Sequence, residues 1–198
     1  MALTAFLTKA EADALAKLVG VDGNEIRGRL DGGVTLELAG KTLGAALKTG
    51  RGTALLAMND GDVSRDQIEK VSGDLRNLFR KGEGRVPVNC LLVILTLKDG
   101  VGVLSPLRLD SQEATLSGAG TVDFVAKRAD VRLQSDHDTT GFFALDVPIV
   151  VSGPFKRLAV TPMPGADDPG LDATSRRAAV DALPAALHKL VSESACAR

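Results

Sequence analysis

The chain has very few aromatic side chains and no excess of charge of either sign. Among its 198 residues there is no Trp and no Tyr, aromatic residues make up 3%, and 24 Lys and Arg face 25 Asp and Glu. Platforms on which bases or sugars could stack are therefore nearly absent, and so is a basic patch with interleaved aromatics. The composition gives no argument for a nucleic-acid partner, and it leaves Leu, Val and Ala to form the core.

Cysteine is too scarce for a metal cluster or a framework of disulfides. Cys90 and Cys196 are the two cysteines of the chain, and their spacing fits neither pattern. The simplest interpretation of Cys90 is a small buried hydrophobe within a strand. A disulfide with Cys196 in an oxidising compartment and a reactive nucleophile remain as alternatives.

Motifs that carry catalysis are also missing. The chain has no Gly-x-Ser-x-Gly elbow, no Walker loop and no dinucleotide fingerprint. The run at 136–138, Asp-His-Asp, is a poor metal site because three adjacent loop residues cannot converge on one ion. The runs at 22–25 and 60–62 lack the spacing of a calcium loop and predict turns. We expect no enzyme activity, no catalytic residue, no metal and no cofactor.

Long apolar runs and a secretion signal are absent as well. No stretch reaches the roughly 18 apolar residues that a transmembrane helix needs. Lys9, Glu11 and Asp13 interrupt any hydrophobic region at the N-terminus, and no basic segment precedes it. Taken alone, these features predict a soluble chain without its own signal or anchor.

The strongest positive signal is the apolar stretch 86–97, which is rich in β-branched residues and favours a strand. Alternate positions give two apolar rows, one with Leu91, Val93 and Leu95 and the other with Leu92 and Ile94. A sheet with one wetted side would leave one of these rows in water. Both faces of this strand therefore need a cover.

Turn signals around this stretch predict an antiparallel meander. The sequence Lys-Asp-Gly at 98–100 is typical of a tight hairpin turn, and Pro106 marks an edge, a bend or a bulge in the following strand. We expect further strands at 28–39, 52–59, 114–117, 120–125, 131–135, 143–151 and 158–161, with a polar loop at 134–142 and an irregular linker at 162–172.

Three helical segments are expected besides a short helix at 42–48. The first runs from Thr8, with Glu11 as its capping-box partner, to residue 19. The best helix begins at Ser64 and has an apolar stripe that is suited to cover one face of the 86–97 strand. The last begins near Thr174, and Pro184 is expected to divide it into two short pieces.

An ordered series of motifs resembles the C-terminal region of the AsmA family. After an amphipathic helix come Val-Pro-Val-Asn-Cys at 86–90, an apolar strand ending in Lys-Asp-Gly, and Ser-Gly-Ala-Gly-Thr-Val-Asp-Phe at 117–124. Val-Ser-Gly-Pro-Phe at 151–155 and Val-Thr-Pro at 160–162 close the series. The resemblance covers about residues 74–164, and the order of the motifs carries it.

The resemblance implies a fold and a domain organisation. We expect an α+β, mainly β protein: an antiparallel meander sheet curled into a groove, with one amphipathic helix packed on it and short terminal helices. Residues 1–80 would form the end of an upstream β-groove repeat, 81–165 the AsmA-like C-terminal sheet, and 166–198 a linker with a C-terminal helical tail. Proteins of this family have an N-terminal membrane anchor and a long periplasmic body, which places the chain on the periplasmic side of the inner membrane.

Two functions follow from the resemblance together with the apolar rows. The first is a non-catalytic module that contributes to outer-membrane assembly and lipid homeostasis by shielding or transferring phospholipid acyl chains along a β-groove. The lipid-groove candidates are Leu91, Val93, Leu95, Leu104, Leu116, Val122 and Phe124. The alternative is an assembly domain that pairs a strand edge with an outer-membrane or other envelope protein.

Overall fold

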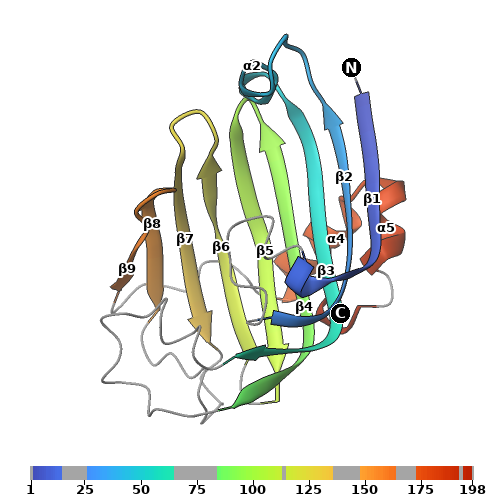
Figure 1. The fold of residues 1–198 in the computed structure, drawn as a ribbon, viewed down its shortest axis with the longest axis vertical. Coiled ribbons are helices and arrows are strands. Elements are labelled where there is room, and N and C mark those ends of the chain that lie inside the picture. The colour runs from blue at the N-terminus through green and yellow to red at the C-terminus, as the bar shows by residue number, and fades with distance from the viewer. Residues whose placement is uncertain are drawn as a thin grey trace.

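The computed structural model describes residues 2–14, 26–64, 84–112, 115–135, 148–163, 173–191 and 194–197. Nine strands in this part of the chain form one sheet, in which each strand pairs antiparallel with the next along the chain, from β1 to β9 (Figure 1). The strands are β1 (Ala2–Glu11), β2 (Ile26–Glu37), β3 (Arg51–Ser64), β4 (Arg85–Lys98), β5 (Val101–Ser111), β6 (Thr115–Asp123), β7 (Arg128–Ser135), β8 (Ile149–Pro154) and β9 (Ala159–Pro162).

The predicted hairpin between β4 and β5 is present and shows why the chain forms a meander. Asp99 and Gly100 have φ angles of 51° and 86°, which are the left-handed values that a tight two-residue hairpin requires. Such short connections keep consecutive strands adjacent in the sheet. The expected meander is therefore confirmed across the described strands.

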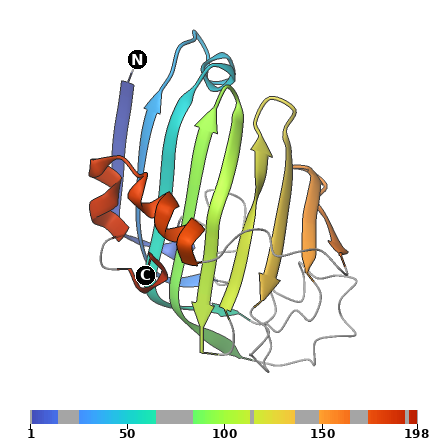
Figure 2. The same cartoon turned by 180° about the vertical axis from the view of Figure 1, so that it is seen from behind.

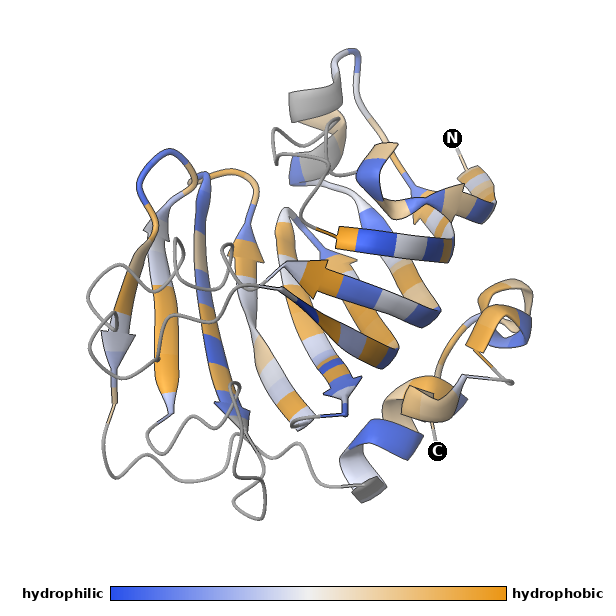
Figure 3. Ribbon diagram, turned by 60° about the horizontal axis from the view of Figure 1, so that its bottom comes forward, coloured by the Kyte–Doolittle hydropathy of each residue, from blue (hydrophilic) through white to orange (hydrophobic). Residues whose placement is uncertain are grey.

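A helical layer covers one side of the sheet. It consists of α4 (Ala173–Asp181), α5 (Ala185–Val191) and the short 3-10 helix η1 (Ala195–Ala197). These helices lie behind the strands in Figure 1, in front of them in Figure 2, and outside the curl of the sheet in Figure 3. The break between α4 and α5 falls next to Pro184, as expected. The buried core on this side joins three sets of residues, from the sheet, the two helices and η1: Leu55, Ala57, Cys90, Leu92, Ile94, Val180, Leu183, Leu187, Val191 and Cys196.

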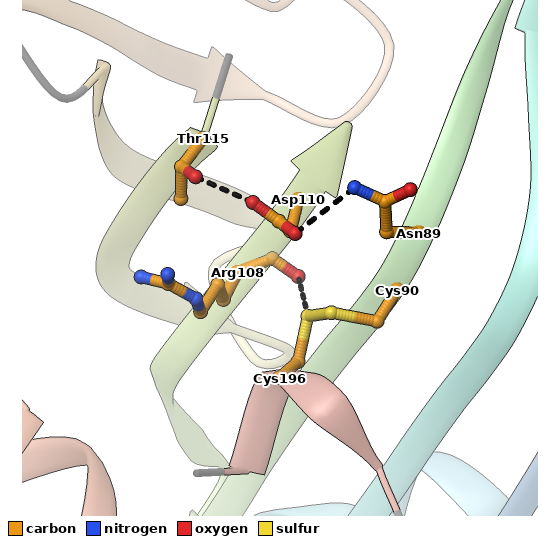
Figure 4. Close-up of a disulfide and its surroundings, with 6 residues drawn as sticks. All are labelled: Asn89, Cys90, Arg108, Asp110, Thr115 and Cys196. Atoms are coloured by element: carbon orange, nitrogen blue, oxygen red, sulfur yellow. Dashed lines mark hydrogen bonds between the residues drawn. A yellow bond between two sulfur atoms is a disulfide. The ribbon is translucent and has the colours of Figure 1, made fainter. Parts of the chain in front are cut away.

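A disulfide between Cys90 and Cys196 fastens the helical layer to β4. The S–S distance is 2.08 Å, and both side chains are buried. The Cys196 sulfur also lies 3.8 Å from the carbonyl oxygen of Arg108 on β5 (Figure 4). The simplest sequence interpretation, a free buried Cys90, is therefore wrong, and the disulfide alternative is confirmed. Sequence could not decide this, because 106 residues separate the two cysteines.

The N-terminal segment differs from its prediction. Residues 2–11 form β1 instead of a loop and the start of a helix, and only residues 12–14 of the expected helix are helical in the described part of the chain. The capping-box signal at Thr8 and Glu11 was misleading, because pairing with β2 over seven registered positions up to residue 10 determines the conformation. The continuation of this helix to residue 19 lies outside the described residues.

Two strands are longer than predicted. The glycines at 118 and 120 do not separate two strands but lie inside β6, where they pair with β5 and β7. The Asp60–Gly61 turn is likewise absent, because β3 continues to Ser64 through an irregularity at Asp60, which has a φ of 65°. Pro106 lies at a bulge of β5, where two residues of this strand oppose one residue of β4. A bulge is one of the three features, with an edge and a bend, that Pro106 predicted.

Some predictions fall on residues that the structure does not describe. They include the helix beyond Ser64, the loop at 136–142, the beginning of the strand at 143–147 and the linker at 164–172. The short helix at 42–48 is confirmed as α2 (Leu43–Lys48). One face of β4 does have a helical cover, as expected, and within the described residues the C-terminal helices provide it. None of the helices in this part of the chain has the length and apolarity that crossing a bilayer requires.

Candidate functional site

The pairing register separates the sheet into two faces. Residues directly opposite each other on neighbouring strands point to the same side of a sheet, so the pairs can be followed from β1 to β9 as rungs. We call the side that carries α4 and α5 the outer face and the opposite side the inner face. Four rungs define the inner face.

The two central rungs of the inner face cross all nine strands without a polar side chain. One consists of Leu7, Gly32, Leu56, Val93, Leu107, Gly118, Leu133, Ile149 and Pro162. The other consists of Ala5, Val34, Ala54, Leu95, Leu104, Gly120, Val131, Val151 and Val160. Because every strand contributes an apolar residue to each of these two rungs, the apolar surface is continuous across the sheet.

The two flanking rungs extend this surface along the strands. On the side of the β4–β5 turn lie Leu3, Leu36, Gly52, Leu97, Gly102, Val122, Ala129 and Gly153. On the other side lie Ala10, Leu30, Met58, Leu91, Leu109, Leu116 and Ser135. No charged residue occurs in these four rungs.

The structure brings the seven candidate residues together on this face. Six of them, Leu91, Val93, Leu95, Leu104, Leu116 and Val122, occupy the four rungs of β4, β5 and β6. Phe124 follows β6 on the same side, and a Cβ added at Gly102 would lie 3.2 Å from its ring.

Sequence reasoning missed most of the inner face. Leu56, Leu107, Val131, Leu133 and Val151 are equivalent to the predicted residues by register. The alternation of Ala129, Val131 and Leu133 with charged residues in β7 was a usable signal for one strand. The face as a whole could not be assembled from sequence, because the strand pairing and its bulges set which residues of different strands lie side by side.

Glycines make room for large side chains on the inner face. A Cβ at Gly118 would lie 2.5 Å from Cδ2 of Leu133 and 3.6 Å from Cδ2 of Leu107, so these leucines fold over the glycine from both neighbouring strands. A Cβ at Gly102 would similarly lie 2.8 Å from Cδ1 of Leu95. The leucines thus lie flat across the glycines, which smooths the apolar surface.

The inner face is not equally open along its length. At the end away from the β4–β5 turn, Leu30, Met58 and Val88 are buried in a cluster against which Leu91 and Leu109 pack. In the central rungs, Val93, Leu95, Leu104 and Leu107 are half-buried. The described elements therefore close one end of this face and leave apolar side chains of its central rungs partly accessible.

Beyond the helical layer the outer face is mainly polar, and Val103 is an exposed apolar residue on it. The outer rung next to Leu95 contains Thr4, Thr35, Thr53, Thr96, Val103, Thr121, Asp130 and Ser152. Asp110 accepts hydrogen bonds there from Asn89 (3.2 Å) and Thr115 (2.6 Å), which tie β4, β5 and β6 together (Figure 4).

Titratable groups do not gather into a reactive centre in the described residues. No group of three or more His, Cys, Asp or Glu side chains lies close enough there to hold a metal ion. Arg85 and Asp62 form a partly buried ion pair between β4 and β3, and burial together with the charge of Arg27 lowers the pKa of Arg85 from its usual value. A cavity of about 470 Å³ lies next to Glu37 and Arg51, away from the central rungs.

These features define a class: an open, curled antiparallel sheet with one continuous apolar face and an opposite face that is apolar beneath a short helical layer and mainly polar beyond it. The chain is 29% identical over 132 residues to the AsmA family protein YhjG of Escherichia coli (strain K12). This match covers 65% of the chain and 19% of that protein, so the chain spans about a fifth of the length of this curated relative. The match confirms the predicted resemblance to the AsmA family.

No protein-family model matches the chain, and no solved structure matches it.

Proposed function

We propose that this chain is a non-catalytic module that shields phospholipid acyl chains along the inner face of its sheet, within the envelope function that the AsmA resemblance implies. The observation that carries the proposal is the continuity of the apolar rungs through all nine strands. A soluble protein rarely exposes a contiguous apolar surface without using it. Burying hydrocarbon there would gain about 0.8 kcal/mol per CH₂ group.

The dimensions of the inner face suit an acyl chain. Four rungs, each two residues apart at about 3.4 Å per residue, span roughly 20 Å along the strands. The hydrocarbon of one bilayer leaflet is about 15 Å thick, which is half of the bilayer core. An acyl chain can therefore lie parallel to the strands within the apolar rungs, or cross several strands along one rung.

The charge distribution supports a fixed orientation of the lipid. Because the four rungs contain no charged side chain, a phosphate headgroup placed among them would lose its hydration without a partner. The headgroup would remain in water at the margin of the sheet, so the face would select hydrocarbon and not a particular headgroup. An inner face of this kind would shield or pass on phospholipids with several different headgroups.

The disulfide supports a location in an oxidising compartment. Disulfides persist in the periplasm and are rare in the reducing cytosol, and the Cys90–Cys196 bond joins the two cysteines of the chain. We therefore place this module on the periplasmic side of the inner membrane, as the family resemblance implies, with a contribution to outer-membrane assembly and lipid homeostasis.

A second candidate function rests on the open edge of the sheet. β1 is an edge strand of ten residues, of which eight are exposed. An exposed edge can accept a strand from another protein through main-chain hydrogen bonds. Complexes without lipid, in which the amides of β1 exchange hydrogen more slowly than in the free chain, would favour this alternative.

Native mass spectrometry with lipid extraction, on chain purified from a periplasmic expression host, tests the lipid proposal. Leu104→Gln introduces an amide into a central inner rung, and Val103→Gln introduces the same amide one residue away on the outer face. Val103 is 50% exposed, so its replacement is the matched control. Circular dichroism and thermal unfolding establish that both variants are folded.

We expect phospholipid with the parent chain and with Val103→Gln, and a reduced amount with folded Leu104→Gln. Uptake of a fluorescent phospholipid should follow the same order. Equal binding by the two variants, or a parent chain that neither retains nor takes up lipid, would refute the proposal that the inner face binds acyl chains.

A further inference from the structure

Three hairpin turns lie side by side at one end of the sheet. They connect β4 to β5, β6 to β7, and β8 to β9 (Figure 1). The amide of Phe124 donates a hydrogen bond to the carbonyl of Gly100 (2.9 Å), and the amide of Phe155 donates one to the carbonyl of Lys127 (2.9 Å). These bonds join the three turns into one row.

Two of these turns expose large apolar side chains. Val125 in the β6–β7 turn is 47% exposed, and Phe155 and Leu158 in the β8–β9 turn are 42% and 47% exposed. We call these three residues the tip patch. The ring of Phe155 packs edge-on against Phe124, with the ring centroids 6.3 Å apart. This contact holds Phe155 of the patch in place.

The local sequence fixes the shape of the β6–β7 turn. The carboxylate of Asp123 accepts hydrogen bonds from the amides of Val125 (2.9 Å) and Ala126 (2.7 Å), and Lys127 adopts a left-handed φ of 54°. Because the turn is held by its own backbone contacts, the exposure of Val125 is not needed for folding. Its side chain is available to a partner.

Basic residues occupy the same turns as the tip patch and their flanks. Within residues 98–101, 123–128 and 154–158, which form the three turns and their flanks, there are five cations and two anions: Lys98, Lys127, Arg128, Lys156 and Arg157 against Asp99 and Asp123. The carboxylate of Asp99 lies 3.6 Å from the guanidinium of Arg51. The carboxylate of Asp123 accepts the hydrogen bonds from the turn amides. This end is therefore positive, although the chain as a whole has a net charge of -1.

We propose that the tip patch docks this end of the sheet onto an anionic lipid bilayer. Exposed aliphatic and aromatic residues among Lys and Arg are the combination that binds the interface of a membrane with anionic lipids. Three separate protruding side chains fit a fluid interface, whereas a specific protein interface needs about 800 Å² of matched surface on each partner. The charge of the patch selects the anionic surface.

The tip patch lies close to one end of the inner face. Phe124, which supports Phe155, packs near Gly102 at the end of the inner face that the β4–β5 turn borders. A bilayer bound at the tips would thus meet the inner face at its margin. Docking rests on the exposed turns alone and does not depend on lipid binding by the inner face.

Vesicle co-sedimentation of the full chain tests the proposal, with vesicles of phosphatidylcholine alone and of phosphatidylcholine with phosphatidylglycerol. Val125→Ser/Leu158→Ser removes two apolar side chains of the patch. Lys127→Gln/Lys156→Gln removes two of its charges. Phe6→Ser is the matched control, because Phe6 is 53% exposed and lies on β1, outside the patch.

We expect the parent and Phe6→Ser to bind the anionic vesicles and to lose binding at high salt, since screening weakens exposed charges. The apolar double variant should bind at least about tenfold more weakly, and the charge variant on the order of tenfold more weakly. Equal binding to both vesicle types, no binding by the parent, or unchanged binding by the apolar double variant would overturn the proposal.

A second readout separates this proposal from the proposed function. Uptake of fluorescent phospholipid from detergent micelles reports on the inner face without a bilayer. A tip variant that takes up lipid from micelles but does not sediment with vesicles confirms docking as a separate property. A parent chain that sediments with anionic vesicles but never takes up lipid supports docking and refutes the role of the inner face.

Discussion

Breaking the Cys90–Cys196 disulfide should cost the chain a large part of its stability. The bond closes a loop of 106 residues, and the loss of loop-closure entropy in the unfolded state corresponds to about 4.7 kcal/mol for a loop of this length. Reduction leaves both sulfur atoms in place, so the packing of Leu92 and Leu187 in the outer core remains. The effect therefore acts mainly through the unfolded chain.

Urea unfolding followed by circular dichroism, with and without a phosphine reductant, measures this effect. We expect the free energy of unfolding to fall by about 2–5 kcal/mol and the dependence on urea to become steeper, because the reduced unfolded chain exposes more surface. Cys90 and Cys196 are 1% and 0% exposed, so reduction of the folded chain should be slow. Cys90→Ala/Cys196→Ala is the control, and the reductant should leave its stability unchanged.

A fall of less than about 1 kcal/mol in the free energy of unfolding on full reduction of the parent would refute this role of the disulfide, because it lies below the usual range for a native disulfide. Loss of the helical signal with the strand signal intact would also contradict it. That result would mean that the disulfide, and not the apolar core beneath α4 and α5, holds the helical layer on the sheet.

Three further predictions concern single positions. Leu187→Ala should lower the free energy of unfolding by about 2–5 kcal/mol, because the side chain is fully buried between α5 and the sheet; chemical denaturation checks this. Gly118→Val should destabilise by about 1–3 kcal/mol, because its Cβ would meet Leu133 at 2.5 Å; an unchanged melting temperature would contradict this close packing. A double-mutant cycle with Asp62→Asn and Arg85→Gln should give a coupling of about 1 kcal/mol that decreases in high salt, because the ion pair is partly exposed.

The short-range features of the fold were readable from the sequence. Asp99-Gly100 predicted the β4–β5 hairpin, Pro106 predicted an irregularity in β5, and Pro184 predicted the break between two C-terminal helices, because each depends on the backbone preferences of one or two residues. The order of motifs predicted the AsmA resemblance that the comparison with YhjG confirmed.

The failures occurred where pairing between strands overrides a local signal. The glycines of β6 resembled a break but pair on both sides within a central strand. The Thr8–Glu11 capping box resembled a helix start but lies in β1. In both cases a whole row of hydrogen bonds to a neighbouring strand outweighs the preference of a few residues.

The sequence by itself determined that one strand is apolar on both sides and that some element must cover it. Tertiary structure decided which row the helices cover, because α4 and α5 reach the row of Cys90, Leu92 and Ile94 only after the chain has folded back onto β4. Tertiary structure also decided that the row of Val93 continues across nine strands, because the register between strands depends on two segments at once and cannot be derived from either alone. The disulfide and the continuous inner face both arise from contacts between residues far apart in the chain.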